Sequence, residues 1–214
     1  MKRVLIILIS LFVLVACQAP VSTQNVDLEV SVLHKSNQAL LVDINEHGLA
    51  WISSTEEFEV GDVLKVTFDG VIMESYPVQL GKIYAIVKID HDEHPILLYS
   101  KIIDILIEEN TKESEIAINL ITLDTAKYDL MYYLNETKST IEFYEVDSWS
   151  ALEALDKLST NADGLYYPNG YYLEISQLND QQLTTILQRS ASTLVENKFN
   201  VQKPDGRYEL EKVE

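Results

Sequence analysis

A period-two alternation of apolar and polar side chains in the first half of the chain is the pattern that most limits how the protein can fold. The apolar runs, most of them alternating, are Leu28–Val32, Leu40–Ile44, Leu49–Ile52, Leu64–Phe68 and Ile83–Ile89. Such alternation is typical of half-buried β-strands, and the Asn, Asp and Gly residues between the runs predict turns. We therefore expect five short strands that form a small antiparallel barrel or a curled sheet.

One stretch of this region carries a resemblance to a known family. The sequence "VGDVLKVTFDGVIMESYP", residues 60–77, resembles the signature of the YobA-like small-lipoprotein domain, which has no assigned activity. The resemblance implies an OB-like β-barrel over residues 27–90. The positions that match the motif are Gly61, Asp62, Asp69, Gly70, Ser75, Tyr76 and Pro77.

The pattern changes after residue 95, where helical and strand signals mix. Pro95 suits the first turn of a helix, and a narrow polar stripe through Ser100 and Glu108 predicts that this helix is largely buried. We expect the order helix, strand, helix, strand, helix and then several strands. Ser150 and Glu153 are spaced like a capping box at the start of the last of these helices, where Trp149, Leu152, Leu155 and Leu158 follow at helical spacing. Between and after these helices, strands are expected at residues 115–123, 141–146, 171–175, around 195–201 and after the turn at 203–206. We expect an α+β domain with a mostly antiparallel sheet over residues 95–214.

The N-terminal segment has the pattern of a secretory signal. Lys2 and Arg3 precede a run of about 13 apolar residues, which is shorter than the roughly 20 that a membrane-spanning helix needs. The end of the run, Leu14-Val15-Ala16-Cys17, resembles the lipobox of bacterial lipoproteins. This resemblance implies cleavage of a signal peptide over residues 1–16 and acylation of Cys17 by palmitate-like chains. The alternative is a conventional signal peptide followed by a free or buried thiol.

The lipobox implies a protein held at the cell membrane by acylated Cys17, facing the outside of the cytoplasm, with residues 17–26 as a tether. With a single cysteine, the chain has no internal disulfide and no cysteine-based zinc site. Loss of residues 1–16 removes two of 16 basic residues and no acid, which leaves 14 basic and 34 acidic residues and a net charge of −20. A charge of this sign repels nucleic acid, so we expect no nucleic-acid partner.

Three groups of residues are candidates for a binding site. Asp90, His91, Asp92 and His94 carry side chains that can bind a divalent cation, although neighbours in an extended segment point in opposite directions and a hydrated linker gives the same composition. Tyr167 and Tyr171 can form a stacking surface for a ligand or can pack a sheet. Ser75 and Tyr76 can line the rim of a pocket or can shape a loop.

The sequence contains no nucleophile elbow, paired-histidine zinc motif or phosphate loop, so we expect no enzyme and no obligatory cofactor. The leading hypothesis is a membrane-anchored extracytoplasmic lipoprotein that acts as a binding or interaction module for an unknown protein, glycan or small ligand. A metal-ion or small-ligand binding protein is the alternative, followed by a cell-envelope hydrolase.

Overall fold

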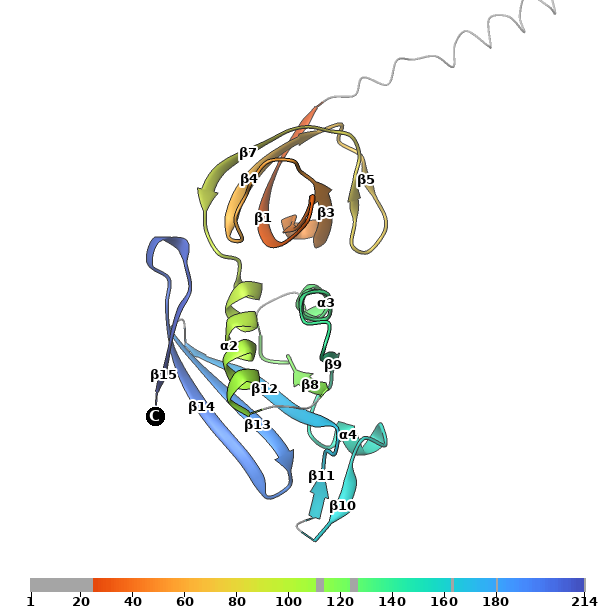
Figure 1. The fold of residues 1–214 in the computed structure, drawn as a ribbon, viewed down its shortest axis with the longest axis vertical. Helices are drawn as coiled ribbons and strands as arrows, with labels where there is room; N and C mark the ends of the chain where they lie inside the picture. Colours follow the sequence, from red (N-terminus) through yellow and green to blue (C-terminus); the bar gives the residue numbers. More distant parts are fainter. Residues whose placement is uncertain (1–24, 111–113, 124–126, 163, 180, 214) are drawn as a thin grey trace, which may run out of the picture.

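The computed structural model describes residues 25–110, 114–123, 127–162, 164–179 and 181–213. The signal segment, Cys17 and most of the tether therefore lie outside the described residues. The described chain is a mixed α+β fold built mostly of strands, in which a five-stranded antiparallel sheet precedes a larger mixed sheet accompanied by three helices (Figure 1). This confirms the expected α+β class.

The first sheet contains all five strands that the alternation predicts. They are β1 (Val26–Ser36), β2 (Ala39–Asp43), β3 (Leu49–Ser53), β4 (Asp62–Phe68) and β7 (Ile83–His91). The strand order is β3-β2-β1-β4-β7, and every neighbouring pair is antiparallel. A short hairpin of β5 (Ile72–Met73) and β6 (Gln79–Leu80) interrupts the path from β4 to β7.

This first sheet curls without closing. Its edge strands are β3 and β7, and no ladder joins them in the described part of the chain. The segment before β6 occupies part of the β3 edge instead, because Val78 bridges Ala50 and donates its N–H to the Leu49 carbonyl at 2.8 Å. The OB-like barrel implied by the resemblance is therefore wrong, and the alternative of a curled sheet is confirmed.

A bulge in β1 lets the first sheet contribute to two apolar clusters. Val32 pairs with Val42 and His34 pairs with Leu41, which leaves Leu33 as the extra residue. Val32 lies in the cluster inside the curled sheet, whereas Leu33 lies in the cluster that contains the helices of the second part. Both side chains are fully buried. One apolar cluster thus extends across the domain boundary that the sequence suggested near residues 90–95.

The second part begins with a helix and continues as a mixed sheet. Its elements are α2 (Pro95–Asn110), β8 (Glu115–Asn119), α3 (Lys127–Thr137), β9 (Glu142–Glu145), α4 (Ala151–Ala154), β10 (Ser159–Asn161), β11 (Gly164–Tyr166), β12 (Gly170–Asn179), β13 (Gln182–Ser190), β14 (Thr193–Gln202) and β15 (Glu209–Val213). Strand β8 runs parallel to β9 and β12, while the other ladders are antiparallel. Among the described helices, none is long and apolar enough to cross a membrane.

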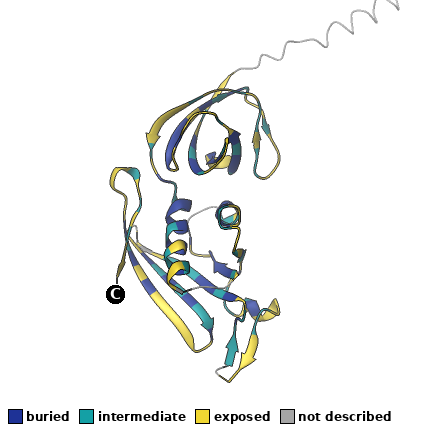
Figure 2. Cartoon of the chain, in the orientation of Figure 1, coloured by how far each residue is buried: buried dark blue, intermediate teal, exposed yellow. Residues whose placement is uncertain are grey.

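Strand β8 is apolar on both sides because each face is covered. Ile116 and Ile118 pack into the cluster formed with α2 and α3, and Ala117 packs on the opposite face with Leu152 and Tyr172. A strand buried on both faces is expected of parallel pairing. Figure 2 shows buried residues along β8 and at the start of α2.

A helix forms after Trp149 as predicted, but the predicted capping box is wrong and the helix is shorter than the leucine spacing suggests. Helix α4 is one turn long, and Ser150 makes no capping bond from its side chain. The Ser150 hydroxyl instead lies 2.9 Å from the Ser148 hydroxyl. Leu152 is fully buried, but Leu155 is 53% exposed, so the helical spacing of the leucines does not produce a continuous buried face.

The link between the two parts is held by the C-terminal turn η2 (Pro204–Gly206). Glu93 donates its N–H to the Gly206 carbonyl at 2.7 Å. Its carboxylate is buried and accepts hydrogen bonds from the Lys101 ammonium and the Tyr208 N–H, both at 2.7 Å. A Cβ on Gly206 would lie 2.1 Å from the His91 carbonyl oxygen, so only glycine fits this approach.

Replacing Leu33 by Ala tests whether the apolar cluster makes the two parts one folding unit. The lost methyl groups and the resulting cavity are expected to cost about 2–5 kcal/mol of unfolding free energy. Urea unfolding should be followed by fluorescence in single-tryptophan variants that keep either Trp51 or Trp149, which report on the first and second parts.

Both probes should shift to lower urea together. Leu194→Ala, at a residue that is 56% exposed, is the control and should cost less than about 0.5 kcal/mol. A shift seen only by Trp51 would show that the two parts unfold independently.

Candidate functional site

The unclosed edges of the first sheet leave a groove of about 490 Å³, which we call the edge groove. It runs between β3 with the residues that follow it and β7 with the residues that precede it. The lining residues are Trp51, Ile52, Ser53, Ser54, Thr55, Glu56, Leu80, Gly81, Ile83, Tyr84, Ala85 and Ile86. Because these residues come from both sheet edges, the groove lies where a closed barrel would have its missing ladder.

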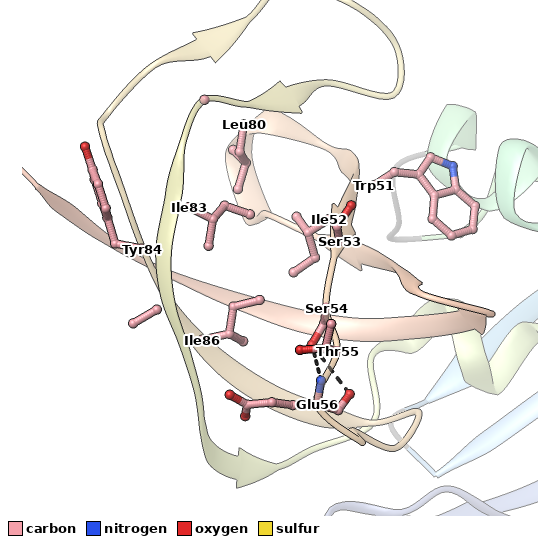
Figure 3. A pocket seen from close by; sticks show the side chains of 12 residues that line it. Trp51, Ile52, Ser53, Ser54, Thr55, Glu56, Leu80, Ile83, Tyr84 and Ile86 are labelled. Atoms are coloured by element: carbon pink, nitrogen blue, oxygen red, sulfur yellow. Dashed lines mark hydrogen bonds between the residues drawn. The ribbon is translucent and has the colours of Figure 1, made fainter.

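The edge groove has an apolar floor and one polar wall. Figure 3 shows Ile83 and Ile86 on β7 facing Ile52 on β3, with Leu80 at one end. These side chains extend the cluster inside the curled sheet, of which Ile52 is a buried member. The opposite wall carries Ser53, Ser54, Thr55 and Glu56. The groove therefore offers apolar contact below and hydroxyl and carboxylate groups along one side.

The charge at the rim of the edge groove is negative. Glu56 and Glu57 are exposed, and neither forms an ion pair with another described residue. On the β7 side, Lys88 forms an ion pair with Asp62 at 2.5 Å, and Lys82 lies over the Tyr84 ring at 5.2 Å and keeps its positive charge. The two glutamates are therefore carboxylates of this rim without an ion-pair partner among the described residues.

Four polar side chains meet where the first sheet contacts helix α3, and we call them the seam cluster: Asp43, Tyr76, His94 and Asp129. Asp43 ends β2, and its carboxylate accepts the Asn45 N–H at 3.0 Å. His94 Nε2 lies 3.6 Å from the same carboxylate. Tyr76 donates its hydroxyl to Asp129 at 2.7 Å. The cluster brings together two residues that the sequence analysis considered separately, His94 and Tyr76.

Burial governs the protonation of the seam cluster. It raises the pKa of Asp43 from 3.8 to about 6, helped by the nearby charge of Asp129. It lowers the pKa of His94, whose Nδ1 accepts the Ile96 N–H and so leaves the proton of the neutral ring on Nε2. Tyr76 is 52% exposed as a whole, but desolvation at its hydroxyl and the bond to Asp129 raise the pKa of that hydroxyl, which keeps it a hydrogen-bond donor.

The seam cluster also holds one wall of the edge groove in place. Trp51, which lines the groove, donates its indole N–H to the Tyr132 hydroxyl of α3 at 3.0 Å. The Tyr132 ring in turn meets the Tyr76 ring edge-on at 5.5 Å between centroids. Gly48, with φ of +79°, passes close to Asp129, because a Cβ there would lie 3.1 Å from the carboxylate. Strand β3 is thereby fixed against α3.

The residues predicted as metal ligands do not converge. His91 Nδ1 lies 3.0 Å from the Asp62 carboxylate, Asp92 pairs with Lys203 at 2.7 Å, and Asp90 accepts the His91 N–H at 2.8 Å. His94 belongs to the seam cluster instead. Within the described ranges, no group of three or more His, Cys, Asp or Glu residues is placed to hold a metal ion.

The tyrosines predicted as a stacking surface lie apart from one another. Tyr167 is fully buried, and its hydroxyl donates to Glu115 at 2.6 Å and contacts the Tyr144 hydroxyl. Tyr171 packs against the cluster of the two longer helices, with the Arg189 guanidinium over its ring at 5.6 Å. Packing therefore accounts for both rings. Ser75 likewise closes its own loop, since its hydroxyl donates to the Pro77 carbonyl at 2.8 Å.

The Gly61-Asp62 and Asp69-Gly70 positions of the motif shape the backbone. Buried Asp62 accepts the Glu59 N–H at 2.9 Å as well as bonds from Lys88 and His91. Burial alone raises the pKa of Asp62, but these bonds together lower it below its usual value. The Asp69 carboxylate accepts the N–H groups of Val71 and Lys82 and so fixes the loop from β4 to β7.

Asp43→Asn tests the seam cluster through the pH dependence of stability. Because the folded pKa of Asp43 is raised, its protonated form stabilises the fold below about pH 4, and that contribution is lost as the pH rises through about 6. Relative to the variant, the parent should therefore lose about 2–3 kcal/mol of unfolding free energy between about pH 4 and pH 7. Urea unfolding at a series of pH values measures this difference. Exposed Glu57→Gln is the control and should run parallel to the parent; parallel curves for Asp43→Asn would contradict the assignment.

Comparison with known proteins assigns no family or function to these sites. No family model, no curated protein and no solved structure matches this chain. The resemblance of residues 60–77 to the YobA-like domain thus stays a prediction, while the contacts above explain what the Gly-Asp and Asp-Gly pairs do in this fold.

Proposed function

We propose that the protein is a bacterial lipoprotein, held at the extracytoplasmic face of a membrane by acylated Cys17, and that its folded body is a binding module. The observation that carries the proposal is the sequence Leu14-Val15-Ala16-Cys17 at the end of a short apolar run. Acyl chains on this cysteine provide the anchor, because two or more chains hold a protein stably at a bilayer.

The edge groove supports a binding role for the body. It combines an apolar floor, hydroxyl groups and an uncompensated carboxylate within about 490 Å³. Sites that bind ligands commonly join apolar surface to a few polar groups that fix orientation. The excess of acidic residues suits a body that stays in solution beside a membrane, since it repels anionic lipid.

The anchor is tested by growing bacteria that express the full chain with an alkyne analogue of palmitate. The parent should carry the label and sediment with membranes, and Cys17→Ser should lose both properties. Gln18→Ala is a matched control, because it changes the neighbouring residue and leaves the lipobox intact. Intact mass of the purified parent should show a chain that begins at Cys17 with added acyl mass. An unlabelled parent, or label that survives Cys17→Ser, would refute the anchor.

A further inference from the structure

Strand β7 is an edge strand with an unusual surface for that position. It is nine residues long, and the described residues pair it with β4 alone. Three of its large apolar side chains are exposed: Tyr84 at 45%, Val87 at 55% and Ile89 at 48%. Figure 2 shows the same strand as largely exposed. A long edge with free N–H and C=O groups and exposed apolar side chains is a template for pairing with another strand.

The edge groove beside β7 matches the side chains of an added strand. In an extended peptide every second side chain points to the same face. A peptide that runs along β7 would place one set of side chains over Ile52, Ile83 and Ile86, and that set must be apolar to bury this floor. The edge of β3 from Trp51 to Ser53 lies across the groove, beyond the part that Val78 covers.

The negative charge of the rim favours basic residues among the peptide side chains that do not face the apolar floor. Glu56 and Glu57 have no ion-pair partner among the described residues, and Asp90 at the end of β7 is also exposed. Figure 3 shows the Glu56 side chain reaching from its segment toward β7. On the β7 side, Lys88 is paired with Asp62, and neither Lys82 nor Lys88 forms an ion pair with Glu56 or Glu57. An added strand that carries Lys or Arg compensates these carboxylates, whereas an acidic strand is repelled.

We propose that the edge groove binds an extended segment of a partner protein with alternating apolar and basic residues, which adds to β7 as a further strand. This inference rests on the proposed function, because it names the partner class of the binding module. Main-chain hydrogen bonds to β7 supply affinity, and the floor and the acidic rim supply specificity, as in other cases of strand addition.

The test uses the full chain in detergent micelles and a fluorescein-labelled nonapeptide of alternating valine and lysine. Fluorescence anisotropy should show saturable binding that weakens as salt is added, because screening shortens the reach of the rim charges. The same peptide with alternate amides methylated cannot form the ladder and should not bind. Amide hydrogen exchange should show new protection in residues 83–90 when the parent peptide is present.

A charge exchange separates specific binding from general attraction to an acidic protein. Glu56→Lys combined with Glu57→Lys should weaken the lysine peptide about tenfold and gain binding of a valine–glutamate peptide. Glu142→Lys combined with Glu153→Lys makes the same change in net charge on exposed residues of the second part and should leave the affinity unchanged.

Equal binding of the methylated peptide, equal loss in both double variants, or protection outside β7 would overturn the proposal. Concentration-dependent protection of β7 without peptide would also overturn it and would identify a second copy of the chain as the occupant. Failure of the peptide to bind leaves the palmitate labelling of Cys17 untouched, so the two proposals fail separately.

Discussion

Val32 and Leu33 are neighbours in the chain, yet β1 buries them in different apolar clusters. The bulge at this point supplies the geometry, and the burial of both side chains supplies the stabilisation. Because Leu33 joins the cluster of α2 and α3, the first sheet is packed against the second part through side chains and not only through the chain between them. The position of β3, and with it one wall of the edge groove, depends on this packing.

Most of the strands could be predicted from the sequence, because period-two alternation depends on local burial and survives in each strand separately. Closure of the first sheet could not be predicted, since it depends on whether β3 meets β7, and Val78 takes part of that edge. Leu33 breaks the alternation in a way that only the β1–β2 register explains. The leucines after Trp149 have helical spacing, but a single turn forms, and Leu152 is buried while Leu155 is exposed.

The sequence identified single residues of the seam cluster but not which residues the fold brings together. His94 and Tyr76 attract notice as chemical groups, but the two carboxylates that they meet, Asp43 and Asp129, are 86 positions apart and have no shared motif. Their burial, which shifts the pKa of Asp43, is a tertiary property. The 90–94 segment shows the converse: its side chains are adjacent in sequence, and extended backbone sends them to separate partners. The edge groove could not be predicted from the sequence, because it exists where β3 and β7 do not pair in the described part of the chain.

The hydrogen bonds that join Glu93 to Gly206, Lys101 and Tyr208 restrict motion between the two parts of the chain. Residues 91–93 are all polar, as in many linkers between domains, but Glu93 is buried and its N–H is bound by the returning C-terminal turn. Rotation of the curled sheet relative to the helices would first have to break these hydrogen bonds. The turn at residues 204–206 and Tyr208 thus limit rotation between the two parts, and the edge groove keeps one orientation relative to the helices.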